Sequence, residues 1–253
     1  MRTVGMIGGI GPESTVAYYR QIISRYRDRR PDGHYPQIII SSIDMTRMLG
    51  LISAGRFADT ADYLAEEIQK LERAGADFAL LASNTPHIVF DSLQAKSRLP
   101  LVSIIEAACR EARRLGLRKV GLFGTKFTMQ GGFYGAVFSK HGIDIVTPNA
   151  ADQETIHEKY MGELVNGIIL DATKRKLLEI ASRLEADTGI EGLILGGTEL
   201  PLILSEADGG AMPFLDTTKL HVESVVDELL TLPNDNNASG CKAQGHQPRQ
   251  AHL

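Results

Sequence analysis

Short apolar stretches alternate along the chain with longer stretches that have the spacing of amphipathic helices. The apolar stretches predict strands at residues 3–8, 37–42, 78–83, 101–104, 119–124, 143–147, 192–196 and 212–215. Between them, apolar positions recur every three or four residues, which predicts helices that include 57–74, 105–115, 154–166 and 173–187. Strands that alternate with helices are typical of βαβ units, in which helices cover both faces of a parallel sheet.

The two halves of this pattern resemble each other in sequence. Four segments of the first half match four of the second half in the same order. The pairs are residues 2–8 with 118–124, Tyr18 with Tyr134, 75–83 with 189–197, and 84–85 with 198–199. Any two βα units share glycines and apolar positions, but four ordered matches favour a duplication. The sequence therefore predicts two pseudo-symmetric α/β halves, each a mainly parallel four-stranded sheet with helices on both faces.

The duplication also suggests how the chain is divided. We expect one half at residues 1–98 together with a C-terminal helix at 216–232, and the other half at 99–215. Residues 233–253 are rich in Asn, Gln, Gly and His and have no periodicity, so we expect a disordered tail. Ligands of parallel sheets bind beyond the carboxyl ends of the strands, which predicts a site in the cleft between the halves.

Composition argues against several classes of protein. A net charge of −4 and no basic stripe argue against a nucleic-acid partner, and no apolar run is long enough to cross a membrane. Two cysteines, Cys109 and Cys241, support neither a disulfide framework nor a metal site. The first residues lack the apolar region of a secretory signal. We therefore expect a cytoplasmic protein without a metal site.

Four polar loops follow predicted strands and lead into predicted helices. They lie at residues 8–15, 83–87, 124–129 and 197–201. Such junctions bind anions through free N–H groups and the helix dipole, although Ser, Thr and Asn also occur there as simple helix caps. Capping is the favoured interpretation of any single loop. Four loops at related positions of a duplicated fold favour a shared site.

Several side chains near these loops are candidates for chemistry. His87 and His221 are candidate acids or bases, and His87 is equally suited to a structural hydrogen bond. Arg47 follows the strand at 37–42 and is a candidate for binding a second, distal carboxylate, or an ordinary surface arginine.

Taken together, these motifs resemble the aspartate/glutamate racemase family over residues 2 to about 230. The resemblance is carried by sequence pieces that follow one another in the family's order. They are Ile7-Gly8-Gly9 with Glu13-Ser14-Thr15, Asn84-Thr85 with His87, Gly124-Thr125 with Thr128-Met129, Thr198-Glu199, and Asp216-Thr217 with His221. The resemblance implies a cofactor-independent enzyme, commonly a homodimer, that acts on a small amino acid or carboxylic acid. The loop positions and the resemblance together give the candidate substrate-binding residues Gly9, Asn84, Thr85, Gly124, Thr125 and Thr198, to which the position of Arg47 after its strand adds a seventh.

The family's catalytic cysteines are absent at the matching positions. The family uses two thiols on opposite sides of the substrate α-carbon, and these positions fall on Ser83, or its neighbour Ala82, and on Gly197. A thiol titrates near ~8.5, whereas a serine hydroxyl needs a neighbouring base and glycine has no side chain. The two-thiol mechanism is therefore excluded.

Three hypotheses remain for the function. The first is an amino-acid isomerase of the aspartate/glutamate type in which Ser83, His87, Glu199 or a bound water transfers the proton. The second is a lyase or decarboxylase in the same pocket, since protonation from one side needs only one donor. The third is a non-catalytic protein that binds a small carboxylate.

Overall fold

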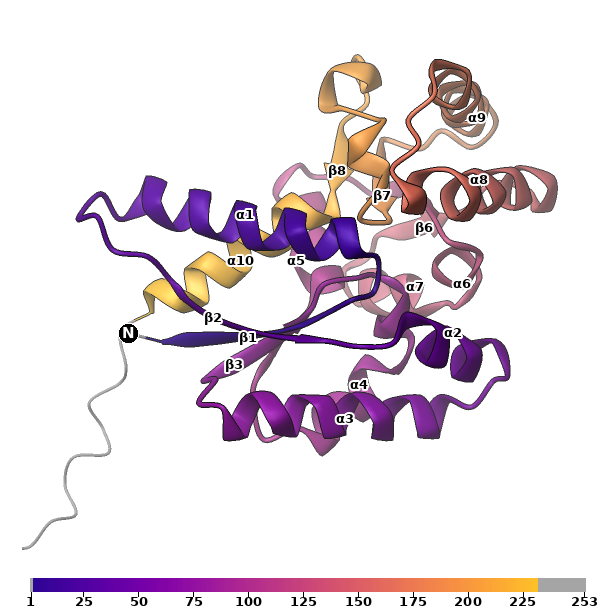
Figure 1. Cartoon of the computed structure of the whole chain (residues 1–253). Coiled ribbons are helices and arrows are strands. Elements are labelled where there is room, and N and C mark those ends of the chain that lie inside the picture. Colours follow the sequence, from indigo (N-terminus) through magenta and orange to yellow (C-terminus); the bar gives the residue numbers. More distant parts are fainter. Residues whose placement is uncertain (1, 232–253) are drawn as a thin grey trace, which may run out of the picture.

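The computed structural model describes residues 2–231, which form two parallel four-stranded sheets (Figure 1). The first sheet has the order β2-β1-β3-β4 and the second the order β6-β5-β7-β8. The first comprises β1 (Thr3–Gly8), β2 (Gln37–Ser42), β3 (Phe78–Leu81) and β4 (Leu101–Val102). The second comprises β5 (Lys119–Gly124), β6 (Asp144–Val146), β7 (Gly192–Gly196) and β8 (Phe214–Asp216). All strand pairs are parallel and the two orders are equivalent, so the predicted α/β fold with two related sheets is confirmed.

Helices connect the strands. They are α1 (Pro12–Arg29), α2 (Met45–Ser53), α3 (Phe57–Arg73), α4 (Phe90–Lys96), α5 (Ile104–Arg114), α6 (Lys126–Gln130), α7 (Phe133–Phe138), α8 (Ala150–Gly162), α9 (Asp171–Thr188) and α10 (Thr217–Leu230). Short 3₁₀ turns lie at Thr85–Val89, Ser139–His141, Leu164–Asn166, Leu200–Leu202 and Glu206–Gly209.

The alternation of side chains along each strand gives each sheet two buried faces. In β1, Val4 and Met6 pack with residues of α1 and α10, whereas Ile7 packs with residues of α3. Figure 1 shows α1 and α10 on one side of the first sheet and α3 on the other. Each fully buried aliphatic side chain contributes roughly 1.5–3 kcal/mol, which explains why both faces are covered.

Helix caps account for two of the places where element boundaries differ from the predicted ones. The strand expected at 101–104 ends at Val102 because the Ser103 side chain accepts a hydrogen bond from Glu106 N at 3.3 Å and begins α5. The helix expected at 154–166 begins at Ala150 because Asn149 caps it, accepting from Asp152 N at 3.0 Å. Single caps of this kind contribute about 1 kcal/mol.

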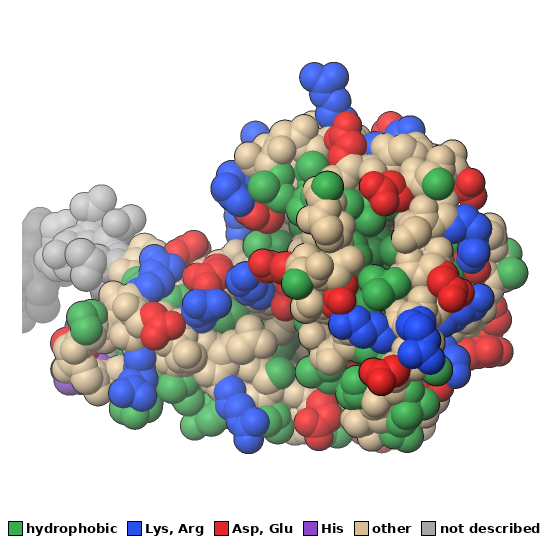
Figure 2. Space-filling model, turned by 90° about the horizontal axis from the view of Figure 1, so that it is seen from above, with side chains coloured by type: hydrophobic (Ala, Val, Ile, Leu, Met, Phe, Trp, Pro, Cys, Tyr) green, Lys and Arg blue, Asp and Glu red, His purple; other side chains and the backbone are tan. Residues whose placement is uncertain are grey.

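Helix α10 packs against helices of both halves, α1 and α5. Ion pairs such as Arg25–Glu223, at 3.1 Å, connect α10 to α1. The segment 233–253, expected to be a disordered tail, lies outside the described residues. No helix within residues 2–231 is both long and apolar enough to span a membrane. Figure 2 shows Lys and Arg side chains interspersed with Asp and Glu side chains over the face seen there.

Candidate active site

The loops that follow β1 and β7 meet across the two halves. Ser14, on the first turn of α1, is buried, and its Oγ lies 2.5 Å from Thr198 Oγ1 and 2.7 Å from Glu199 Oε1. Thr198 and Glu199 follow β7 after one intervening residue, Gly197, and are also buried. A side chain of the first half therefore bonds directly to the strand-end loop of the second half.

The loop after β3 makes the second connection between the halves. Asn84 is buried; its Oδ1 accepts from Tyr134 OH at 2.6 Å and its Nδ2 donates to Thr217 Oγ1 at 3.2 Å. Thr217 in turn donates to Leu195 O of β7 at 2.7 Å. Asn84 is thereby fixed between α7 and the first turn of α10.

A third connection joins two threonines. Thr85 Oγ1 lies 3.1 Å from Thr125 Oγ1, which lies 3.1 Å from Thr128 Oγ1. All three hydroxyls are buried. We call the set of buried polar side chains between the halves the polar layer; it comprises Ser14, Asn84, Thr85, Thr125, Tyr134, Tyr160, Thr198, Glu199 and Thr217.

Helix capping explains only one of the predicted binding residues in this layer. Thr125 caps α6, accepting from Thr128 N at 3.3 Å. Asn84 and Glu199 each precede a 3₁₀ turn, but their side chains make no capping hydrogen bond. Because an unpaired buried polar group costs about 1–3 kcal/mol, residues that do not cap a helix need another reason to be buried there.

Glycines allow the loops to approach each other closely. Gly11 has φ 86°, and a Cβ there would collide with Glu199 Oε1 of the other half. A Cβ at Gly9, where φ is 79°, would lie 2.5 Å from Ile43 O, and one at Gly124 would lie 2.6 Å from Gly196 O. Close packing of neighbouring backbone therefore explains why glycine occupies positions 9 and 124, two predicted ligand-binding positions.

Glu199 is the centre of a small cluster of oxygen atoms. Its carboxylate is 2% exposed and accepts hydrogen bonds from Ser14, Thr198 and Tyr160. Among residues 2–231 it forms no ion pair with Lys or Arg. We call Ser14, Tyr160, Thr198 and Glu199 the Glu199 cluster.

The positions of the two missing thiols differ in their surroundings. Ser83 is 7% exposed, and its hydroxyl makes no hydrogen bond to another described residue. At Gly197, by contrast, a Cβ would lie 2.9 Å from both Cζ and the hydroxyl oxygen of Tyr160. One position therefore presents a free hydroxyl, and the other is filled by a neighbouring aromatic ring.

The two candidate histidines are held by the backbone. His87 Nε2 accepts from Ile104 N at 3.2 Å, so Nδ1 carries the hydrogen and donates to Ser83 O at 3.0 Å. Burial and the nearby His221 lower the pKa of His87 to about 3. Both ring nitrogens of His87 are bonded to the backbone, which is the structural alternative given for this residue, and its role as an acid or base stays a prediction.

Both ring nitrogens of His221 are also hydrogen-bonded. It donates from Nε2 to Val102 O and accepts at Nδ1 from Tyr18 OH, both at 2.9 Å. Burial lowers the pKa of His221 to about 4. Both imidazoles are therefore neutral at neutral pH.

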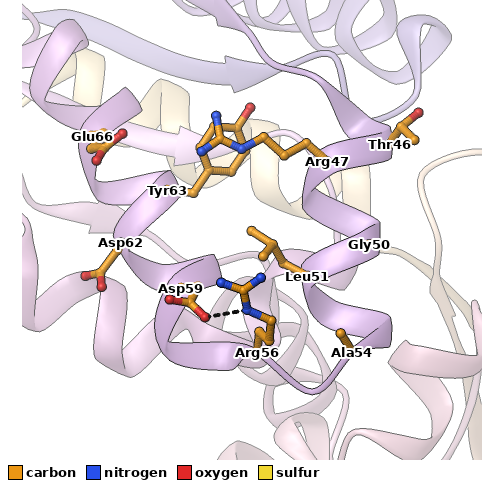
Figure 3. Close-up of a pocket in the computed structure, with 10 residues that line it drawn as sticks. All are labelled: Thr46, Arg47, Gly50, Leu51, Ala54, Arg56, Asp59, Asp62, Tyr63 and Glu66. Carbon is orange, nitrogen blue, oxygen red and sulfur yellow. Dashed lines mark hydrogen bonds and ion pairs between the residues drawn. The ribbon is translucent and has the colours of Figure 1, made fainter.

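Arg47 lies outside the polar layer. Its guanidinium lies 4.2 Å above the Tyr63 ring, at the edge of a surface cavity of about 550 Å³ between α2 and α3 (Figure 3). Arg56 pairs with Asp59 at 2.7 Å in the same cavity. The role of Arg47 in binding a distal carboxylate stays a prediction, since here the side chain stacks on Tyr63.

Several members of the polar layer were not identified from the sequence. Ser14 and Thr217 belong to the quoted motifs, and Tyr134 to the internal repeat, but none was given a role. Tyr160 has no such signal in the sequence. Thr218 Oγ1 is a further buried oxygen atom without a hydrogen-bond partner among residues 2–231.

Neither metal-binding groups nor thiols occur at this site within the described residues. Residues 2–231 contain no cluster of three His, Cys, Asp or Glu side chains that could hold a metal ion. Cys109 is buried on α5 among apolar residues of the second half, where burial raises the pKa of its thiol.

The paired parallel sheets and the polar layer between their strand-end loops define a duplicated α/β protein with a site between its halves. The model of the Asp/Glu/hydantoin racemase family matches residues 7–225, and the chain belongs to this family. The chain is 23% identical over 239 residues to the broad specificity amino-acid racemase of Bacillus subtilis (strain 168), covering 90% of this chain and 98% of that protein.

Solved structures agree with this assignment. An aspartate racemase homologue from Pyrococcus horikoshii is similar with a TM-score of 0.78 and 34% identity, covering 90% of this chain and 99% of that one. The aspartate racemase of Picrophilus torridus shares the fold, with a TM-score of 0.71 at 22% identity over 90% of this chain and 94% of that one.

Proposed function

We propose that this protein is a cofactor-independent isomerase that moves the α-proton of a small amino acid or related carboxylic acid held between its halves. The observation that carries the proposal is the polar layer, because helix capping explains only Thr125 among its loop residues. A buried layer of hydroxyl, amide and carboxylate groups costs free energy unless its members are hydrogen-bonded, and here they bond to one another between the two halves, where a ligand can replace these bonds. Membership of the racemase family supports such a ligand.

The substrate carboxylate takes the place of hydrogen bonds that the layer now makes within itself. Asn84, Thr85, Thr125 and Thr198 are all buried and already bonded to partners in the other half or in α10. Each presents a hydroxyl or amide donor that a carboxylate oxygen accepts. Binding therefore exchanges contacts between the halves for contacts through the ligand.

Proton transfer uses oxygen acids in place of thiols. Ser83 provides a hydroxyl without a hydrogen bond to any other residue of the described range 2–231, and Glu199 provides a buried carboxylate at the equivalent end of β7. A serine hydroxyl needs a base to accept its proton, so we assign the stronger base to the Glu199 side. His87 has no part in this step, since its ring nitrogens are bonded to the backbone.

Product analysis of single enantiomers tests the proposal. The L- and D-forms of aspartate, glutamate and uncharged amino acids are incubated separately and resolved by chiral chromatography. Appearance of the opposite enantiomer is the expected result. A decarboxylated or eliminated product would instead establish the lyase alternative.

A non-catalytic binding protein is the second candidate. The observation that favours it is the lack of a free imidazole or thiol at the layer among the described residues. Saturation-transfer NMR contacts with an amino acid that comes back unchanged would establish this alternative. The homodimer and the cytoplasmic location stay predictions.

A further inference from the structure

Gly197 has no side chain, and the space that a side chain at this position would occupy is filled by another residue. Tyr160 projects from α8, and its hydroxyl oxygen and Cζ each lie 2.9 Å from the point where a Cβ of residue 197 would stand. Real Cβ atoms essentially never approach other atoms so closely. The tyrosine ring therefore fills the volume into which a side chain at position 197 would project.

Tyr160 is held firmly in this place. It is 5% exposed and packs in the core of the second half with residues of α9 and of the turn after β7, including Leu177 and Leu200. Its hydroxyl donates to Glu199 Oε2. The same carboxylate accepts from Ser14, so the phenol is connected to the first half of the molecule.

The hydroxyl groups of the Glu199 cluster carry fewer hydrogens than the cluster has oxygen–oxygen contacts. Three hydroxyl groups, those of Ser14, Tyr160 and Thr198, supply three hydrogens. They serve four oxygen–oxygen contacts: Ser14–Thr198, Ser14–Glu199, Thr198–Glu199 and Tyr160–Glu199. The carboxylate oxygens of Glu199 are hydrogen-bond acceptors for all three hydroxyl groups, so a proton that arrives at one of these hydroxyls has a direct path to the carboxylate.

Burial and the charge of Glu199 raise the pKa of Tyr160 well above its ordinary value. The phenol is therefore protonated at neutral pH, and a free phenolate is disfavoured. Tyr160 can take a proton only if it passes its own hydrogen on to the carboxylate at the same time.

We infer that Tyr160 supplies the proton-transfer atom that residue 197 lacks, with Glu199 as the group that exchanges a proton with it. This rests on the proposed function and goes beyond it by naming the reacting atom on the β7 side. The α-carbon–hydrogen bond breaks and its proton binds the Tyr160 oxygen, while the Tyr160 hydroxyl proton moves to Glu199 Oε2. The electron pair stays on the substrate as an enediolate. The reverse transfer returns a proton to the α-carbon.

Tyr160→Phe is the direct test, because it keeps the ring and removes only the hydroxyl. Exchange of the α-proton in deuterated water should fall by roughly 10²–10⁴-fold, the usual contribution of a positioned acid or base. Ligand affinity measured by saturation transfer should change only a few-fold. The matched control is Tyr26→Phe on α1, which removes a hydroxyl that, among the described residues, accepts a hydrogen bond from Arg30 alone; its exchange rate should equal that of the wild type.

A second variant separates a chemical role from a structural one. Tyr160→Ala combined with Gly197→Cys opens the volume and places a thiol in it. The account predicts that exchange returns and that its pH profile moves toward the titration of a thiol, near ~8.5.

The outcomes distinguish this inference from the function on which it rests. If the wild type exchanges the α-proton and Tyr160→Phe exchanges it at the same rate, the role of Tyr160 is wrong. The proposed isomerase function is not affected by that result. Absence of exchange in the wild type with every acid tested would overturn the proposed function and this inference with it.

Discussion

The imidazoles of His87 and His221 show how burial decides the role of a residue. Both are nearly free of solvent, and their rings lie 6.3 Å apart. Each uses one nitrogen to donate to a backbone carbonyl, Ser83 O or Val102 O. Sequence alone gives the residue type and its loop, but the backbone groups that bind the ring are set by the fold.

These histidines should make the protein sensitive to acid. Their folded-state pKa values, about 3 and about 4, lie below the ordinary 6.5, so the unfolded state binds more protons between these limits. The contribution of the two histidines to the free energy of unfolding is therefore complete above pH 6.5. It should fall as the pH drops toward 4, by up to about 1.4 kcal/mol per pH unit for each histidine. Urea unfolding at several pH values measures this slope.

Replacing His87 by Gln should reduce the slope between pH 6.5 and pH 4. The control is His34→Gln, at an exposed position. An identical slope in His87→Gln and wild type would contradict the assignment of a buried neutral imidazole.

Asn84 and Thr198 allow a second test at the residue scale. We expect Asn84→Ala and Thr198→Ala to abolish ligand binding, because each removes a buried donor of the polar layer. Each should also cost about 1–3 kcal/mol of stability, since a partner is left unpaired, while the melting curve stays cooperative. Saturation-transfer NMR and thermal melting measure the two effects; the exposed Thr231→Ala is the control, and unchanged affinity in both site variants would remove the proposed pocket.

At the scale of elements, helix starts determine where the polar side chains lie. Asp216 caps α10, accepting from Thr218 N at 2.9 Å and Lys219 N at 3.1 Å. The first residue of α10, Thr217, binds Asn84 and Leu195 O. The cap of α10 therefore helps to position the polar layer.

Asp216 and Asp44 form a matched pair that tests this dependence. Asp44 caps α2, accepting from Thr46 N at 2.9 Å, and α2 carries no member of the polar layer. Replacing either aspartate by Ala should cost about 1 kcal/mol. Only Asp216→Ala should also weaken binding of an amino acid without a second carboxylate, in a titration followed by NMR, because Arg47 on α2 is the predicted partner of a distal carboxylate alone. Equal binding by the two variants would show that the α10 cap does not position the site.

At the scale of the whole molecule, the hydrogen bonds of the polar layer hold the two halves together without a ligand. A ligand that replaces them and binds only the folded state stabilises it by mass action, by about 2.7 kcal/mol at a hundredfold excess over Kd. For a chain of this size the melting temperature should rise by roughly 5–10 °C. Thermal melting with a panel of amino acids measures the rise. The Asn84→Ala variant is the control, and an equal rise in that variant would place the ligand elsewhere.

The repeat and the periodicity were enough to predict the fold, because both sheets depend on local patterns. The strands at 3–8, 37–42, 119–124 and 192–196 have the predicted bounds. The loop motifs likewise led to Asn84, Thr85, Thr125 and Thr198, which the structure brings into one layer.

Tyr160 was not predictable in the same way. It lies in the last turn of α8, and its contact with residue 197 depends on how α8 packs against the second sheet. A missing side chain is visible in the sequence, but the residue that fills its volume is determined by tertiary packing.

The most direct test of the central claim is proton NMR of aspartate, glutamate and related small acids incubated with the wild-type protein in deuterated water. The account predicts that the α-proton signal of at least one acid is lost over time, and that the Asn84→Ala variant slows this loss. Retention of the α-proton in every acid, at protein concentrations that saturate binding, would contradict the account.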